Sequence, residues 1–308
     1  LQIINVCLGC LLYIPAVRGL NKVYGNRKIH FPFLDTTYMR RQEEAELLND
    51  DPIVVAQKEE KSVAKVEDKL ESISRKEFCM EYQPQISPLT GAVVGSEALV
   101  RARGDSNKLI YPGDFLPWFE KAGLMKDLDI WVFKQVAKDI QEWNRQGNYV
   151  PVSVNITPQT LVDVDCMDRI VEMIAPVANQ VNIEITEETL LVDEQALVMA
   201  FNRLHLLGVK VYIDDFGTGF SSLSYLNRFD IDAIKVDRSF ILALDTDKGR
   251  KVFASIVSIA SQLDIAVVVE GVETTEQLLE IPKNNDISVQ GWLFSRSLLK
   301  EKFIDYCL

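Results

Sequence analysis

Histidine, cysteine and positive charge are all scarce in this chain of 308 residues. The two histidines, His30 and His205, have no metal-ligand spacing, so a catalytic or metal-binding histidine is not expected. The five cysteines are odd in number, and no histidine lies near Cys7 and Cys10 to complete a zinc-type pairing. This cysteine usage favours a reducing, cytosolic environment.

The shortage of positive charge limits the class of partner. Lysine and arginine number 33 against 45 aspartate and glutamate residues, which gives a formal net charge of -12. A protein that holds polymeric nucleic acid has to neutralise phosphates, so we expect no nucleic-acid polymer as a partner. A small anionic ligand would need metal ions or a local basic spot.

The remaining composition is that of a folded protein. Hydrophobic residues make up 47% of the chain and charged residues 25%, which provides for a sizeable core and excludes a wholly disordered or low-complexity protein. At roughly 150 residues per domain, the length fits either one large α/β barrel with an extension or two compact domains.

The apolar run at the start of the chain falls slightly short of a membrane span. Residues 1–17 contain only Gln2 and Asn5 as clearly polar side chains, whereas a spanning helix needs about 20 apolar residues. Basic residues follow this run, a pattern that disfavours a secretory signal and is typical of a helix end facing the cytoplasm. Because the chain begins with Leu, we interpret residues 1–28 as the membrane-associated end of a longer chain. A buried amphipathic helix is the alternative.

The next stretch, residues 29–76, is charged and is interpreted as a linker. Apolar residues recur at helical spacing from Val63 to Ile73, which predicts a short amphipathic helix that leads into the following domain. The expected organisation is therefore an apolar segment (1–28), a charged linker (29–76) and one globular domain (77–308).

The globular domain alternates strand-like apolar runs with amphipathic helices, which is typical of βα units. Only a turn separates the first two expected strands, so these two are expected to be antiparallel. The pattern predicts a TIM-type (β/α)8 barrel of the α/β class with irregular first strands. One expected helix, 248–263, has Val252 and Leu263 on its apolar face. The expected strands are 78–86, 93–102, 152–156, 181–186, 210–214, 233–236, 266–270 and 287–290, and the other helices include 126–146 and 193–207.

Polar residues lie where six of these strands end, which is the mouth at which such a barrel holds its active site. A single carboxylate at a strand end is usually a solvated cap, and Asp214 with Asp215 has the alternative of an ordinary helix N-cap. Their convergence from six strands favours one shared acidic site with a single lysine, Lys235. The residues concerned are Glu97, Asn155, Glu184, Glu187, Asp214, Asp215, Glu270, Glu273 and Gln290.

Clustered carboxylates repel one another, and in a mostly apolar barrel mouth they are costly unless cations compensate them. Ligands that are all oxygens suit Mg²⁺ or Mn²⁺ better than zinc. The adjacent Asp214 and Asp215 can bridge two ions, an arrangement that activates water and stabilises a phosphoryl displacement. The residues alone therefore predict two-metal phosphodiester hydrolysis.

Five ordered motifs extend this interpretation: SEALVR at 96–101, DDFGTGFSSLSYL at 214–226, IKVDRSF at 234–240, EGVET at 270–274 and QGWLF at 290–294. Together they resemble the EAL-domain cyclic di-GMP phosphodiesterases, from about residue 77 to the C-terminus. The resemblance implies Mg²⁺- or Mn²⁺-dependent hydrolysis of cyclic di-GMP to linear pGpG in the bacterial cytoplasm. The rival is a catalytically weak cyclic di-GMP receptor attached to a sugar transporter, against which the complete ligand set argues.

The resemblance also implies a role for each motif residue. Glu270 would be the general base as well as a metal ligand, and Lys235 would orient or activate the hydrolytic water. Glu187 would steady the loop after Asp214 and Asp215. The implied ligands are Glu97, Asn155, Glu184 and Asp214 for the first ion and Asp214, Asp215 and Glu270 for the second, with Gln83, Arg101, Glu273 and Gln290 contacting or supporting substrate.

A few positions depart from the family pattern. Ala102 stands where an aromatic residue is common, Ser297 replaces a frequent proline, and Pro282 shortens the last outer helix. None of these departures is expected to touch a motif residue. Because EAL barrels commonly pair, the resemblance implies a homodimer, with the expected helix 222–228 near the pairing surface. The alternative is that its apolar residues Leu223, Tyr225 and Leu226 belong to the core.

The apolar start carries a weaker resemblance. The string LQIINV, followed by LYIP and basic residues, is similar to the last transmembrane segment of the enzyme IIC sugar-transport subunit of the phosphotransferase system. This implies an inner-membrane protein, anchored through residues 1–17, with its catalytic domain in the cytoplasm. If the apolar segment is only a fragment, the chain would be a soluble cytoplasmic protein.

Overall fold

The structure of the chain is a computed structural model that describes residues 78–104, 108–218 and 224–307. The expected apolar segment (1–28) and the expected linker helix lie outside these residues. Within the described ranges, no helix has the length and apolar character needed to cross a membrane.

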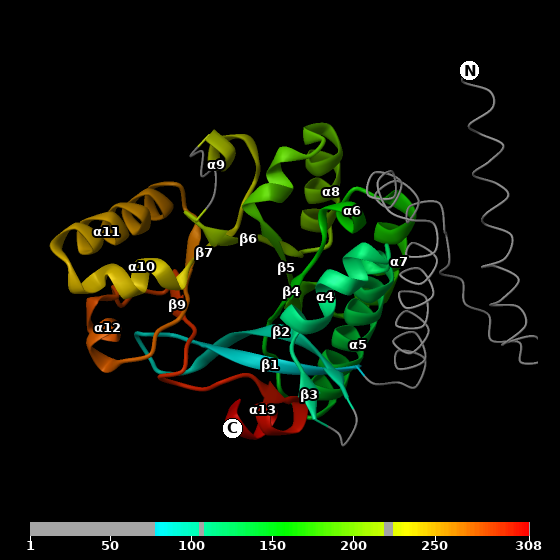
Figure 1. The fold of residues 1–308 in the computed structure, drawn as a ribbon, viewed down its shortest axis with the longest axis horizontal. Coiled ribbons are helices and arrows are strands. Elements are labelled where there is room, and N and C mark those ends of the chain that lie inside the picture. The colour runs from blue at the N-terminus through cyan, green and yellow to red at the C-terminus, as the bar shows by residue number, and fades with distance from the viewer. Residues whose placement is uncertain (1–77, 105–107, 219–223, 308) are drawn as a thin grey trace, which may run out of the picture. The chain divides into compact units, whose positions relative to one another are not determined.

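Eight strands close into a barrel (Figure 1) because the first strand pairs with both the second and the last of the ring. The first strand, β1, runs antiparallel to both neighbours, and the remaining pairs in the ring are parallel. The expected barrel with an antiparallel first pair is confirmed. The ring consists of β1 (Phe78–Ile86), β2 (Val93–Arg103), β4 (Val152–Asn155), β5 (Val181–Thr186), β6 (Lys210–Phe216), β7 (Ala233–Val236), β8 (Ala266–Val269) and β9 (Ile287–Val289).

Two further strands, β3 (Leu109–Ile110) and β10 (Leu298–Leu299), were not expected from the sequence. Each has two residues, β3 pairing with β2 and β10 with β1. A two-residue strand has no alternation to detect, so only the pairing partner reveals it. Through β10, the chain after β9 returns to β1 beside the barrel mouth.

Helices cover the outside of the barrel on both sides (Figure 1). The three longest expected helices are confirmed to within a residue or two as α5, α8 and α11. Short polar side chains cap several helices; Asp163, for example, accepts a hydrogen bond from Cys166 N at the start of α7. The helices are α4 (Pro112–Lys121), α5 (Met125–Arg145), α6 (Pro158–Leu161), α7 (Val164–Ile174), α8 (Glu194–Leu206), α9 (Ser224–Arg228), α10 (Arg238–Leu242), α11 (Asp247–Gln262), α12 (Thr275–Glu280) and α13 (Lys300–Cys307), with 3-10 turns η2 (Ala175–Gln180), η3 (Glu187–Leu191) and η4 (Ala243–Asp245).

The expected apolar face of α11 is partly wrong. Val252 and Leu263 are 39% and 47% exposed, whereas Phe253 and Ala260 are buried. The buried face of the helix is therefore narrower than the distribution of its apolar residues indicates. Scattered apolar residues are common on protein surfaces, so their presence alone does not define the buried face.

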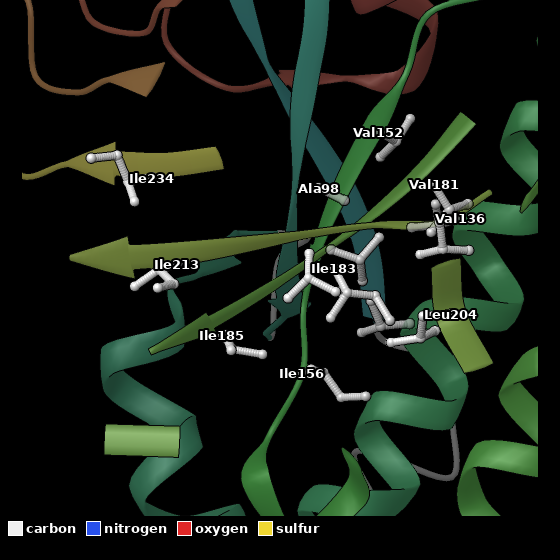
Figure 2. Close-up of a cluster of buried hydrophobic side chains, with 14 of the residues drawn as sticks. Ala98, Val136, Val152, Ile156, Val181, Ile183, Ile185, Leu204, Ile213 and Ile234 are labelled. Carbon is white, nitrogen blue, oxygen red and sulfur yellow. The ribbon is translucent and has the colours of Figure 1, made fainter. Parts of the chain in front are cut away.

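Side chains of β5 show how the fold brings acidic residues inward. Val181, Ile183 and Ile185 belong to the buried apolar cluster that also includes side chains of α5 and α8 (Figure 2). Each fully buried side chain of this size contributes about 1.5–3 kcal/mol. Because side chains alternate between the two faces of a strand, Asn182 and Glu184 occupy the opposite face, inside the barrel. The apolar outer face thus determines where Glu184 lies.

Candidate active site

The site is organised around Lys235 of β7, whose side chain is 1% exposed. Its Nζ lies 2.8 Å from Glu184 Oε2, 2.9 Å from Asp214 Oδ1 and 2.9 Å from Glu270 Oε1. A fourth carboxylate, Glu97 Oε2, lies 3.4 Å away. Carboxylates from β2, β5, β6 and the end of β8 therefore meet at one ammonium group, as the sequence predicts, although Glu97 lies in the middle of β2 and not at its end.

Carboxamides fill the gaps between these carboxylates. Asn155 Nδ2 donates to Glu97 Oε1 at 3.1 Å and to Glu184 Oε2 at 3.4 Å. On the other side, Gln290 Nε2 donates to Glu97 Oε2 at 2.6 Å and to Gln83 Oε1 at 3.3 Å. These amide groups orient the carboxylates without adding charge, which leaves Lys235 as the cation at the centre of this cluster.

A second group of acidic side chains lies at the edge of the mouth. One oxygen each from Asp214, Asp215 and Glu270 lie within 4.8 Å of one another, a spacing at which they can share a metal ion. Asp215 has a positive φ of 52°, a conformation that aspartate tolerates better than most residues, and its N–H donates to Asp214 Oδ1 at 3.0 Å. This bend points two adjacent carboxylates toward the same place.

Burial changes the proton affinity of these groups. Desolvation raises the pKa of Glu184 well above its usual value, against the opposing effect of Lys235. Desolvation, aided by Glu97 and Asp214, likewise raises the pKa of Glu270 to about 7. Burial alone would lower the pKa of Lys235, but the surrounding carboxylates raise it well above its usual value, so the lysine stays charged.

The donor set fits divalent cations. Five carboxylates, those of Glu97, Glu184, Asp214, Asp215 and Glu270, face one lysine, so a fully ionised site carries four uncompensated negative charges. Two divalent ions would balance them. In addition, Glu184 Oε1 is buried with no hydrogen-bond partner, which is costly for a carboxylate oxygen unless a cation meets it.

The loop after β6 is attached to η3 by Glu187. Glu187 Oε1 accepts a hydrogen bond of 2.7 Å from the N–H of Gly217, two residues beyond Asp215. The carboxylate of Glu187 is therefore directed to the loop backbone and lies apart from the group around Lys235.

Arg101 lies in a buried ion pair at the rim. Its Nε donates to Glu81 Oε2 at 2.8 Å, and its Nη2 lies 3.1 Å from Ser297 Oγ. The expectation that Ser297 touches no motif residue is wrong, because its hydroxyl contacts Arg101 and also donates to Glu81 at 2.7 Å. A proline at this position has neither hydrogen bond available.

Glu273 does not join the acidic cluster. Its Oε1 lies 2.8 Å from Arg238 Nη2, at the start of α10. Sequence reasoning missed Arg238, although it lies within the IKVDRSF motif, because the motif does not show that its guanidinium group pairs with Glu273. It also missed Gln85, whose Nε2 donates to Gln290 Oε1 at 3.1 Å inside the barrel.

The raised pKa values predict an unusual pH dependence for the metal-free protein. A folded Glu270 with a pKa of about 7 binds protons between pH 4.5 and 7 that the unfolded chain, at its usual 4.5, does not bind. The free energy of unfolding should therefore fall with rising pH across this window, by about 3 kcal/mol at most from Glu270 and further from Glu184. Lys126 lowers the pKa of Asp163 to about 2, so the titration of Asp163 affects stability only at a pH below this window.

Urea denaturation in EDTA at about pH 5.5 and about pH 7.5 would measure this fall. The matched variant Glu270→Gln should show a smaller difference, because one titrating group is gone. Mn²⁺ should stabilise the protein more at the higher pH, since metal ligands have to be deprotonated. Higher stability of the metal-free protein at the higher pH would contradict the assignment of these raised pKa values.

The geometry agrees with comparisons to known proteins. The model of the EAL domain family matches residues 66–297. Cyclic di-GMP phosphodiesterase NbdA of Pseudomonas aeruginosa is 36% identical over 224 residues, which cover 71% of this chain and 29% of the relative. Cyclic di-GMP phosphodiesterase PdeR of Escherichia coli (strain K12) is 32% identical over 231 residues, covering 74% of this chain and 35% of the relative. The chain spans less than half the length of these curated relatives.

A solved structure has the same fold as this chain. The structure described as PaMucR phosphodiesterase in a c-di-GMP complex superposes with a TM-score of 0.72 at 30% identity, covering 77% of this chain and 98% of that one. The likeness thus extends over nearly the whole of that domain and over most of the residues described here.

Proposed function

This chain belongs to the EAL domain family, and we propose that it is a divalent-metal-dependent phosphodiesterase that hydrolyses cyclic di-GMP to linear pGpG. The observation that carries the proposal is the convergence of four carboxylates on the buried Lys235, with Asp215 beside them. Relatives named cyclic di-GMP phosphodiesterases support the choice of substrate.

Two ions, Mg²⁺ or Mn²⁺, fit the donor set. One would be held by Glu97, Asn155, Glu184 and Asp214, and the other by Asp214, Asp215 and Glu270. When bound, such ions lower the pKa of a water molecule and neutralise charge on the phosphodiester. For this arrangement the Asn155 side-chain oxygen has to turn toward the ion, while its NH₂ group keeps a hydrogen bond to Glu97 or Glu184.

The protein's own groups supply the proton transfer and the alignment. Glu270, at the end of β8 beside Lys235 and the Asp214–Asp215 pair, is placed to accept the proton of the attacking water as the new P–O bond forms and the bond to the leaving ribose oxygen breaks. Lys235 stays charged, holds Glu270 and Asp214 in place and orients the water. The leaving ribose oxygen takes up a proton from solvent, and because only one ring bond is cleaved the single product is the linear dinucleotide.

The residues at the rim would bind the rest of the substrate. Arg101 offers positive charge to a phosphate, and its ion pair with Glu81 fixes its direction. Gln83 and Gln290 form a hydrogen-bonded pair beside Glu97 and present amide groups to the substrate. Glu273 supports the loop that carries Glu270, and Glu187 supports the loop that follows Asp215.

Incubation of the purified chain with cyclic di-GMP and Mg²⁺ or Mn²⁺, followed by chromatographic separation of the products, tests the function. We expect linear pGpG with either ion and no product in EDTA. Binding of cyclic di-GMP without any product would identify a receptor and contradict the proposed enzyme.

Location and assembly complete the proposal. Relatives of this chain include bacterial signalling proteins, which is compatible with a signalling role. We place the chain at the inner membrane through residues 1–17, with the barrel in the cytoplasm, and as a dimer that pairs near α9. A barrel found in the soluble fraction of fractionated cells would favour the soluble cytoplasmic alternative, and light scattering that shows an active monomer at every concentration would exclude the dimer.

A further inference from the structure

The short helix α10 lies directly after Lys235 and contacts two loops of the site. Asp237, two residues beyond the lysine, caps it by accepting a hydrogen bond from Ser239 N at 2.9 Å, so the helix begins at Arg238. From this start, the side chains of Arg238 and Phe240 reach different neighbours. Each of these neighbours is a glycine with a positive φ: Gly217 lies two residues after Asp215, and Gly271 directly follows Glu270.

Phe240 packs on the loop that follows Asp214 and Asp215. A Cβ placed on Gly217 would lie 2.4 Å from Phe240 Cζ and 2.6 Å from Cε2, so the ring rests directly on the glycine backbone. Gly217 has a φ of +96°, and its N–H donates to Glu187. The loop is thus held between the carboxylate of Glu187 on one side and the ring of Phe240 on the other.

Arg238 packs on the loop that carries Glu270. A Cβ on Gly271 would lie 2.3 Å from Arg238 Cγ and 2.5 Å from its Cβ, so the aliphatic part of the arginine covers the residue next to Glu270. Gly271 has a φ of +69°. The guanidinium group then pairs with Glu273 at 2.8 Å, three residues beyond Glu270.

We propose that α10 is a bridge that sets the separation between the Asp214–Asp215 pair and Glu270, with Arg238 and Phe240 as positioning residues. The inference rests on the proposed function, because it assigns these three carboxylates to one metal ion. Their oxygens lie within 4.8 Å of one another, and a metal site tolerates displacements of only about 0.5 Å. A rigid element that contacts both loops keeps this spacing constant.

The exposure of Arg238 allows a positioning role to be distinguished from a contribution to folding stability. Arg238 is 49% exposed in its ion pair, and such pairs contribute little to folding, about 1 kcal/mol or less. Loss of its charge should therefore change metal binding more than it changes the stability of the metal-free protein. Mutation of a residue that supports a metal ligand typically lowers metal affinity or activity by about 10–100-fold.

The experiment compares Arg238→Gln and Phe240→Leu with the unchanged chain. Mn²⁺ affinity is measured by titration calorimetry, the metal-free melting temperature by calorimetric scanning, and kcat and KM with cyclic di-GMP. We expect Mn²⁺ affinity and kcat to fall about tenfold in each variant, with little change in the melting temperature of Arg238→Gln. Arg238→Lys, which keeps the charge and most of the aliphatic stem, should restore affinity to within about threefold, a smaller loss than that expected for a supporting group.

Arg203→Gln is the matched control, because Arg203 is also partly exposed and ion-paired, with Asp168 on a different part of the barrel. It should leave all readouts unchanged. Unchanged Mn²⁺ affinity in both Arg238→Gln and Phe240→Leu would overturn the bridge, whatever the activity. If the chain without substitutions binds Mn²⁺ but does not hydrolyse cyclic di-GMP, the proposed enzyme is overturned. In that case, tenfold weaker Mn²⁺ binding by the two variants would still support the bridge. No Mn²⁺ binding by the unchanged chain would overturn both.

Discussion

Asp214→Asn is expected to reduce the rate of cyclic di-GMP hydrolysis by about a thousandfold. Asp214 is assigned to both proposed ions, so its neutral replacement removes one shared charged ligand from each. Its Oδ1 also lies 2.9 Å from Lys235 Nζ, and the variant therefore loosens the lysine that orients the water. The turnover number at saturating Mn²⁺ measures the effect, with circular dichroism to establish that the variant is folded.

Asp230→Asn provides the matched control. The Asp230 side chain is 88% exposed and lies near His205, away from the acidic cluster. The same chemical change there should leave turnover within about twofold of the unchanged chain, since it alters no group assigned to the transition state. Near-normal hydrolysis by a correctly folded Asp214→Asn variant would falsify the two-metal assignment.

The second large effect is expected on stability. Lys235→Met should lower the free energy of unfolding of the metal-free protein by about 3–5 kcal/mol near neutral pH, because removal of one partner leaves buried charges unpaired. Three carboxylate oxygens lie within 2.9 Å of Lys235 Nζ, and none of them gains a replacement partner from a methionine. Urea denaturation in EDTA measures the loss.

Two comparisons sharpen this experiment. Lys126→Met removes a lysine that is 41% exposed and paired with Asp163, so it should cost less than about 1 kcal/mol. Mn²⁺ should recover part of the stability lost in Lys235→Met, because the ions offset the same negative charge. A loss below about 1 kcal/mol in Lys235→Met would indicate that these carboxylates need no cationic partner in the metal-free protein and would contradict the central role assigned to Lys235.

The longer strands could be predicted from the sequence because their alternation of apolar and polar residues involves only neighbouring positions. Along β5, Val181, Ile183 and Ile185 alternate with Asn182 and Glu184, and this alternation alone predicts which residues face the barrel interior. The short strands β3 and β10 were not readable, because two residues carry no period. The buried face of α11 was misjudged at Val252 and Leu263 for a related reason, since apolar content does not define a direction.

The sequence by itself determined the strand order, the barrel class and the positions of the acidic residues at one mouth. These follow from alternation, from strand length and from the geometry of a closed barrel, in which parallel strands end on the same side. The ordered motifs added the family.

Only the tertiary structure decided which groups meet. Gln290 and Glu97 are 193 residues apart and share a hydrogen bond, and Arg101 meets Ser297 over a separation of 196 residues. The pairing of Glu273 with Arg238, in place of a position in the acidic cluster, is likewise a contact between the loop after β8 and the start of α10. Such partners depend on the closure of the barrel and on the return of the chain to β1, because a local pattern specifies the face of a side chain but not what lies opposite it.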